Sequence, residues 1–156
     1  MPEAHLGGSS SPRWRPATPE DEPFLRALHA ETHTDFEGLP ERNVLLDLQY
    51  RARTAGYAAR YPGACRLILL GEAGPVGMVL LAEEEDITVV VDLAVLPAWQ
   101  GRGVASAALR TVQATCSSGG VRLQVRADSP ARRLYGRLGF REVSSDALRV
   151  AMHWTP

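Results

Sequence analysis

Two glycines before a predicted helix are the residues of this chain whose spacing most clearly suggests chemistry. Gly101 and Gly103 follow a loop that contains Pro97, and Arg102 lies between them. Glycines allow several backbone amides to turn toward one point, and the N-terminus of a helix adds partial positive charge, to which Arg102 adds a full charge. This stretch therefore predicts a binding site for a pyrophosphate.

A dinucleotide site is the first alternative, because the two glycines fit the start of the Gly-x-Gly-x-x-Gly fingerprint. Ser106 occupies the position of the third glycine, and the loop 96–100 is long for a motif whose first glycine directly follows a strand. Only 31 residues follow Val125, too few to complete a doubly wound sheet. These features disfavour the dinucleotide interpretation.

The elements that would position the glycine loop follow from the apolar pattern and the turn residues. The run 87–96 is β-branched and apolar on both faces except at Asp92, which is typical of a central strand buried on both sides. Gly119 and Gly120 end the helix that the loop opens, and Gly139 ends a second, shorter helix. Strands are predicted over 13–17, 66–70, 76–82, 87–96, 121–125, 140–143 and 148–153, and helices from 18 and over 41–60, 102–117 and 130–138.

This order predicts an α/β (α+β) fold in a single domain, with a mixed, mostly antiparallel sheet, about four helices and one parallel crossover. The helix over 41–60 is expected to bury a face of leucines and alanines, namely Leu45, Leu48, Ala52, Ala55 and Ala59.

A metal site is the other chemistry to consider. His29 and His33 are four residues apart near the end of the first helix and could bind a metal from one face. No third ligand is placed beside them, so we expect an exposed helix end and no metal.

The composition bounds the class of protein. With 156 residues, 45% of them hydrophobic, the chain fits one ordinary domain, which we place at 13–156 after a Gly/Ser-rich tail, 1–12, that is predicted to be disordered. No apolar run approaches the ~18 residues of a membrane-spanning helix, and the first residues do not resemble a signal peptide. Two cysteines, Cys65 and Cys116, cannot build a disulfide framework. We therefore expect a cytoplasmic protein without a membrane partner.

The net charge of −1 hides an uneven distribution. Residues 1–98 hold 8 arginines and 15 acidic residues, whereas residues 99–156 hold 9 arginines and 3 acidic residues. A basic C-terminal half suggests an anionic ligand or nucleic acid. The alternative is that arginines such as Arg132 and Arg133 form the solvated face of a helix. No aromatic residues are interleaved as stacking platforms, so we expect no nucleic acid.

Two motifs resemble those of a known enzyme family. The stretch 93–105, with Leu-Ala-Val-x-Pro followed by Gln-x-x-Gly-x-Ala, resembles the coenzyme A signature of the GNAT superfamily of N-acetyltransferases. The run 129–140 resembles the family's second motif, Asn-(x)-x-Ala-x-x-Leu-Tyr-x-x-x-Gly-Phe. The resemblance covers about 13–154 and implies a GNAT-like sheet with splayed central strands.

The resemblance also implies acetyl-CoA as a cosubstrate. In the family, backbone at the end of the central strand binds the pantetheine arm, and the Val95 amide would point at the thioester oxygen, where negative charge develops. Ser129 or Asp128 fills the place of the family's asparagine. The cofactor-binding residues implied are Leu93, Ala94, Val95, Gln100, Gly101, Arg102, Gly103, Val104, Ala105 and Ser129.

Tyr135 corresponds to the family's general acid. A phenol with a pKa of about 10 is protonated at neutral pH and can give its proton to a thiolate, whose conjugate acid has a pKa of about 8.5. From spacing alone, Tyr135 would be a core aromatic residue in register with Ala131 and Leu138.

Two carboxylates are candidates for the general base. Asp92 lies in an apolar strand, where desolvation favours the protonated form of a carboxylate; the alternative is a structural ion pair with an arginine. Glu85, at the mouth of the same strand, could act through a water molecule, or could simply belong to a solvated hairpin tip.

We therefore expect an acetyl-CoA-dependent N-acetyltransferase that works by direct transfer in a ternary complex, without a metal. Its acceptor would be a small-molecule or peptide amine, and the last strands are candidates for pairing two copies of the chain in a homodimer. The alternative from another class is a non-catalytic acyl-CoA-binding or regulatory module of the same fold, since Gln124 stands where some relatives place a glutamate base.

Overall fold

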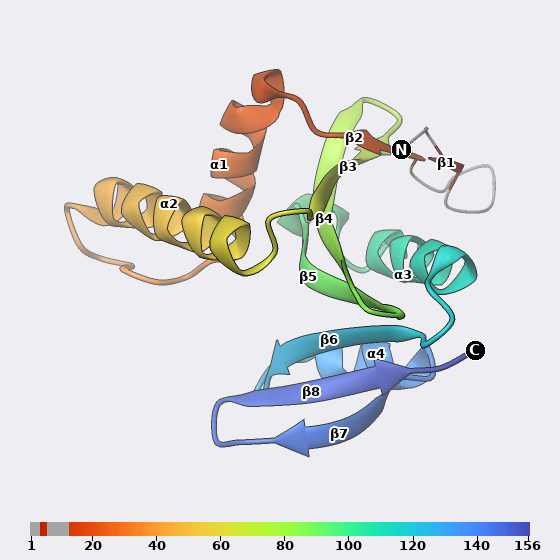
Figure 1. Cartoon of the computed structure of the whole chain (residues 1–156). Coiled ribbons are helices and arrows are strands. Elements are labelled where there is room, and N and C mark those ends of the chain that lie inside the picture. The colour runs from red at the N-terminus through yellow and green to blue at the C-terminus, as the bar shows by residue number, and fades with distance from the viewer. Residues whose placement is uncertain (1–3, 6–12) are drawn as a thin grey trace.

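One sheet runs through the molecule and carries helices on both of its faces (Figure 1). The computed structural model describes residues 4–5 and 13–156, and the strand order is β1-β2-β3-β4-β5-β6-β8-β7. The strands are β1 (Ala4–His5), β2 (Arg13–Pro16), β3 (Cys65–Gly71), β4 (Gly74–Glu84), β5 (Ile87–Val95), β6 (Val121–Arg126), β7 (Arg141–Ser145) and β8 (Arg149–Trp154). The helices are α1 (Glu22–Thr32), α2 (Arg42–Arg60), α3 (Val104–Thr115) and α4 (Ala131–Arg137), with short 3-10 turns at Pro19–Asp21 and Pro97–Trp99.

These elements confirm the predicted fold class. All neighbouring strands are antiparallel except β5 and β6, which are parallel. Most of the predicted disordered tail, 1–12, lies outside the described residues; within it, β1 pairs with β2. None of the described helices is long and apolar enough to cross a membrane.

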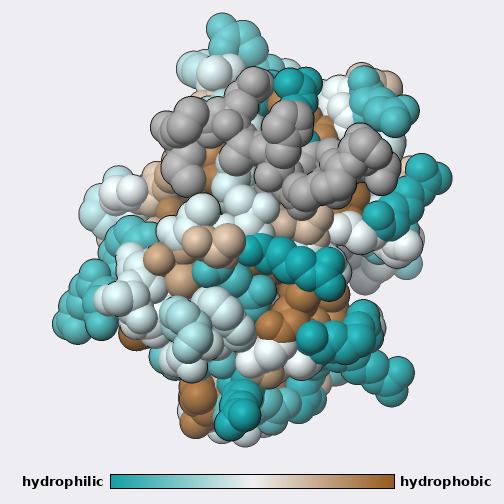
Figure 2. Space-filling view, turned by 90° about the vertical axis from the view of Figure 1, so that its right-hand side faces the viewer, coloured by the Kyte–Doolittle hydropathy of each residue, from teal (hydrophilic) through white to brown (hydrophobic). Residues whose placement is uncertain are grey.

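The sheet has two buried faces because side chains alternate along its central strands. Leu67 and Leu69 of β3 belong to a hydrophobic cluster with α3, whereas Ile68 belongs to a second cluster with α1 and α2. The α1–α2 pair therefore covers one face, and α3 with α4 covers the other. On the side of the molecule shown in Figure 2, hydrophobic residues are interspersed with hydrophilic ones.

A capping box between Thr18 and Asp21 fixes the 3-10 turn that leads into α1. The backbone N–H of Thr18 donates to the Asp21 carboxylate (2.8 Å), and both terminal nitrogens of Arg15 donate to the same carboxylate (2.8 Å each). The hydrogen bonds from Arg15 hold the pKa of Asp21 at about 2. One buried charge pair thus joins β2 to the first helix.

β5 and β6 run together for only part of their length. Their parallel pairing joins 88–90 to 121–123, and beyond this point the two strands separate (Figure 1). Along β4 the register shifts between Leu80 and Leu81, because Val91 of β5 is an extra residue without a partner in β4. A bulge of this kind bends a strand and re-aims the side chains that follow it. The implied splay of the central strands is confirmed.

α2 buries a different face from the expected one. Leu46 and Tyr50 are buried and Tyr57 is half-buried, whereas Leu48 is 55% exposed. The alanines at 52, 55 and 59 are exposed. The expected face was wrong because burying two aromatic rings removes more apolar surface from water than burying three methyl groups.

Candidate active site

The separation of β5 and β6 opens a cavity of about 610 Å³. Its walls come from α1 and α2 on one side and from β5, β6 and α4 on the other. A cavity of this size is in the range of small-molecule sites. It brings together eight of the predicted site residues, namely Asp92, Leu93, Ala94, Val95, Gln100, Ala105, Ser129 and Tyr135.

The backbone at the end of β5 presents an amide to this cavity. The N–H of Leu96 donates to the Val76 carbonyl (2.8 Å), so these two residues form a hydrogen-bonded pair of the β4–β5 ladder. Such pairs alternate along an antiparallel ladder, so the N–H groups of Leu93 and Val95 point away from β4, toward the side from which β6 has withdrawn. The Leu93 N–H donates to the Asp92 carboxylate (2.9 Å). The Val95 amide is therefore the donor that β5 offers to a ligand.

Two left-handed glycines shape the loop before α3. Gly101 has a φ of 77°, and Gly103, which precedes the first residue of α3, has a φ of 82°. The first N–H groups of a helix have no partner within it, so those of Val104 and Ala105 are directed out of the helix start. The Gln100 N–H, also expected to face a pyrophosphate, instead donates to the Pro97 carbonyl (3.2 Å).

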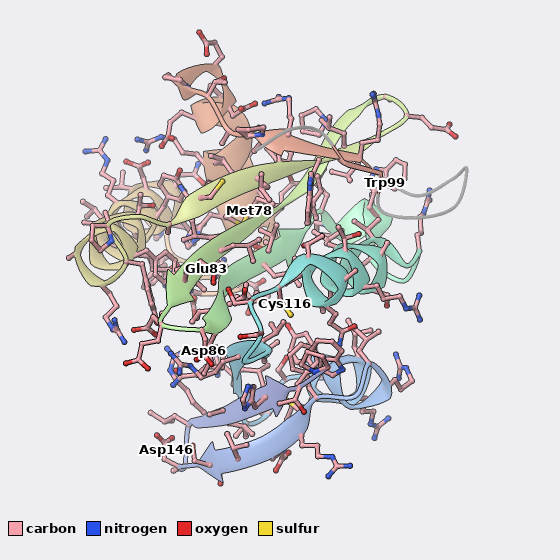
Figure 3. All side chains as sticks on the ribbon, turned by 45° about the vertical axis from the view of Figure 1, so that its right-hand side comes forward. Met78, Glu83, Asp86, Trp99, Cys116 and Asp146 are labelled. Atoms are coloured by element: carbon pink, nitrogen blue, oxygen red, sulfur yellow. The ribbon has the colours of Figure 1, made fainter. Side chains whose placement is uncertain are left out.

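Side chains tie this loop to the sheet. The Gln100 side-chain amide donates to the Val95 carbonyl (3.0 Å), and the Arg102 guanidinium lies 5.0 Å from the centre of the Trp99 ring. The Trp99 ring packs against Gly71, where an added Cβ would lie 3.2 Å from it. In Figure 3, Trp99 and the hairpin residue Asp86 lie at opposite ends of the molecule's central strands. The loop and its cation are thus fixed at one end of the cavity.

Tyr135 reaches the cavity from α4. Its ring packs edge-on against Phe140, with 6.0 Å between the ring centres. Burial raises the pKa of its hydroxyl, and the negative charge of Asp92 raises it further. The phenol therefore stays protonated throughout the neutral range, while the ring also fills the role of a core aromatic residue.

Asp92 lies directly after the bulge in β5 and lines the cavity. Its carboxylate accepts a hydrogen bond from the Leu93 N–H and lies 3.7 Å from Nη2 of Arg53. Asp92 thus meets the requirements of both roles considered for it: it faces the cavity, as a general base must, and it has an arginine beside it, as in a structural ion pair.

Ser129 lies just before the start of α4 and lines the cavity. Its Oγ accepts a hydrogen bond from the Ala131 N–H (3.2 Å). The side chain of Asp128 is 76% exposed and lies 3.3 Å from Arg126. Of the two residues considered for the asparagine position, the structure therefore brings only Ser129 to the cavity.

Glu85 does not reach the cavity. It lies exposed in the turn between β4 and β5, with a φ of 57°. Its neighbour Glu84 pairs with Arg60 (3.0 Å) and with Arg122. Of the two candidates for the general base, the structure brings only Asp92 to the side of Tyr135.

The cavity wall also contains residues of α1 and α2, and His33 just after α1, that were not expected at a site. Among them are His29, His33, Arg53 and Tyr57. His29 is buried, with its ring stacked on that of His33 at 4.0 Å, so the expected exposed helix end was wrong. Burial lowers the pKa of His29. Among the described residues there is no group of three or more His, Cys, Asp or Glu that could hold a metal ion.

Arg53 is the centre of this group. Its Nη1 donates to Nε2 of His33 (3.2 Å), and its Nη2 donates to the Tyr57 hydroxyl (2.8 Å). His33 in turn donates from Nδ1 to the His29 carbonyl (2.7 Å), which fixes its neutral tautomer. Among the described residues, Asp92 is the single carboxylate within 4 Å of this guanidinium.

Comparison with known proteins identifies the family. Residues 23–140 match the Acetyltransferase (GNAT) family. The PaiA N-acetyltransferase of Thermoplasma acidophilum, solved with coenzyme A, has a TM-score of 0.71 at 15% identity, over 94% of this chain and 99% of that one. A Corynebacterium glutamicum structure described as histone acetyltransferase HPA2 and related acetyltransferase has a TM-score of 0.66 at 21% identity, over 94% and 97% of the two chains.

A GCN5-related N-acetyltransferase from Rhodopseudomonas palustris has a TM-score of 0.61 at 24% identity, over 96% of this chain and 99% of that one. No curated protein sequence gives a significant match. The solved structures share the fold, and the matched family spans most of the chain. The protein therefore belongs to the GNAT family of acetyltransferases.

Proposed function

We propose that the protein transfers the acetyl group of acetyl-CoA to a primary amine within a ternary complex. The observation that carries this proposal is that the Val95 end of β5, Tyr135 and Asp92 line one cavity. A thioester in this space would lie between an amide donor and a protonated phenol. The coenzyme A bound to the related PaiA structure supports the choice of cosubstrate.

In this proposal the amine nitrogen attacks the thioester carbonyl, so that a C–N bond forms and the C–S bond breaks. Asp92 takes one proton from the incoming ammonium and passes it to solvent, which leaves the neutral amine as nucleophile. The Val95 N–H donates to the carbonyl oxygen as negative charge develops there. Tyr135 gives its proton to the departing thiolate, and the proton that the nitrogen loses on forming the amide restores the phenol.

The glycine loop would hold the other end of the cosubstrate. Arg102 and the amides at the start of α3 would present positive charge to the diphosphate. Ser129 and the backbone of 93–95 would line the path of the pantetheine arm. Binding energy from these remote contacts positions the thioester beside Tyr135.

Calorimetry with coenzyme A, followed by a thiol-release assay with acetyl-CoA and a panel of primary amines, tests the proposal. We expect saturable binding and release of one thiol for each amide formed. The absence of binding heat up to about 1 mM coenzyme A would contradict the proposal, because even weak specific sites bind at that concentration.

A second candidate is an acyl-CoA-binding module without turnover, which the closeness of Arg53 to Asp92 favours (3.7 Å). In this arrangement the carboxylate that the transferase proposal uses as the base already has an arginine beside it. Binding of acetyl-CoA without thiol release for any amine would support this module, and turnover with any amine excludes it.

A further inference from the structure

The cavity carries an excess of positive charge in its walls. Four arginines line it, and Asp92 is the single carboxylate among the described residues that do so. Outside the cavity, by contrast, Arg60 and Arg122 share the carboxylate of Glu84 as an ion-pair partner. The arginines of the cavity wall are Arg53, Arg66, Arg126 and Arg149.

Two of these arginines lie side by side on the face of the sheet opposite to α3. Arg126 of β6 is directly opposite Arg149 of β8, so both side chains project from the same face. The alternate residues Leu123 and Val125 belong to the cluster with α3, which places the arginines on the opposite side, with α1 and α2. The proposed pyrophosphate site lies at the N-terminus of α3. Arg126 and Arg149 therefore lie on the opposite face of the sheet from that site.

Arg149 has no ion-pair partner among the described residues. Asp146 accepts a hydrogen bond from its backbone N–H (2.9 Å), whereas Arg126 lies 3.3 Å from Asp128. Arg149 is exposed, so a bound anion could reach it and compensate its charge.

Arg53 is hydrogen-bonded to the Tyr57 hydroxyl (2.8 Å) and lies 3.7 Å from Asp92. Arg149 lines the same cavity. Burial raises the pKa of Tyr57, the charge of Asp92 raises it further, and the charges of Arg53 and Arg149 oppose this rise. A positive and a negative group therefore stand next to each other in the wall of the cavity.

We infer that the acceptor belongs to the α-amino acids, with its carboxylate held by Arg149 and Arg53 and its amine held by Asp92. An ammonium and a carboxylate on the same carbon match the adjacent charges of Asp92 and Arg53, and guanidinium groups bind carboxylates with two parallel hydrogen bonds. The amine then lies beside Tyr135 and the Val95 amide. This inference rests on the proposed function and names the class of its acceptor.

Matched pairs of acceptors test the inference in the thiol-release assay. Each L-amino acid is compared with the amine that lacks its carboxylate: leucine with isoamylamine, phenylalanine with phenethylamine, and arginine with agmatine. We expect kcat/KM for the best amino acid to exceed that of its matched amine by about tenfold or more, since hydrogen bonds between charged groups are strong. An equal or higher value for the matched amine overturns the inference and leaves the proposed function intact.

Arg149→Gln assigns the effect to this side chain. We expect the ratio of kcat/KM between the two members of a pair to fall toward one, and Arg149→Lys to restore part of it. Arg122→Gln is the matched control, because Arg122 projects from the same face of β6 but is ion-paired with Glu84 and does not line the cavity. An Arg149→Gln enzyme that keeps the wild-type ratio overturns the inference.

Failure of the proposed function has a different signature. If neither member of any pair is acetylated, calorimetry on the protein saturated with coenzyme A decides the ligand class. Binding of an amino acid, but not of its matched amine, supports the inference although the transferase proposal fails. Absence of binding by every amino acid overturns the inference as well.

Discussion

Tyr135 combines two properties that a proton donor to a thiolate needs, a place in the cavity wall and a hydroxyl that stays protonated. Tyr135→Phe removes only the hydroxyl and keeps the ring contact with Phe140. We expect kcat to fall by about 100-fold or more, as is typical for loss of general acid catalysis. Because the role proposed for the phenol is to protonate the leaving group, the Kd for acetyl-CoA should change by less than about twofold. Steady-state kinetics and calorimetry measure both, and an unchanged kcat would remove Tyr135 from this role.

Asp92 acts on Tyr135 through its charge, so its effect can be separated from that of burial. We expect Asp92→Asn to lower the pKa of Tyr135 yet leave it above the ordinary value of about 10, since burial is the larger cause of the rise. The phenolate absorbance of Asp92→Asn is titrated against that of Asp92→Asn/Tyr135→Phe, which isolates this one tyrosine. An unchanged pKa would show that the two groups do not interact.

The sequence could predict these two residues but not their partners on α1 and α2. Tyr135 belongs to a motif of consecutive residues, 129–140, which can be recognised in the sequence. Asp92 is the single charged residue in an apolar strand. His29 and Arg53 reach the cavity only because two helices far from β5 in sequence pack across its face. The sequence of a helix does not show which other element its surface will contact. A polar residue at the edge of the apolar stripe is therefore predicted to be exposed to solvent.

Among the elements, the glycine loop depends on backbone conformation more than on space. An added Cβ meets nothing within 4 Å at either Gly103 or Gly56, but Gly103 has a φ of 82°, whereas Gly56 lies within α2. We expect Gly103→Ala to lower the free energy of unfolding by about 1 kcal/mol and to weaken coenzyme A binding. Gly56→Ala, the control, should raise the free energy of unfolding by about 0.5–1 kcal/mol without affecting binding. Urea denaturation and calorimetry test the pair, and effects of equal sign would contradict this reading of the loop.

The strands were easier to predict than the buried face of α2. Turn residues such as Gly74 and Gly139 delimit the strands, and alternation or continuous apolar character marks their interiors. In α2, two rows of residues at helical spacing compete, one rich in alanine and one that contains Leu46, Tyr50 and Tyr57. Both rows have the same period, so periodicity could not choose between them; the larger apolar area of the second row did.

Across the whole molecule, the uneven charge of the two halves of the sequence has a mixed outcome. Arg126 and Arg149 of the basic half line the cavity, in agreement with an anionic ligand, whereas Arg133 is exposed on α4 as a solvated helix face predicts. Arg53 comes from the acidic half, and the fold brings it to the same cavity. Charge along the chain therefore pointed to the right region but could not define it, because the cavity is built from both halves.

The stability of the whole molecule should depend on acid through Asp21, which joins β2 to α1. Hydrogen bonds from Arg15 hold the pKa of Asp21 at about 2, below the ordinary value of about 3.9 for an unfolded chain. A lowered folded-state pKa gives stability that is complete above about pH 4 and is lost as the pH falls toward 2. We expect Asp21→Asn to reduce the free energy of unfolding by about 2 kcal/mol near neutral pH, and this deficit to shrink below pH 4. Urea denaturation of both proteins between about pH 7 and 2 measures the difference, and a deficit that stays constant with pH would show that the loss comes from packing, because only an ionised carboxylate makes the contribution titrate.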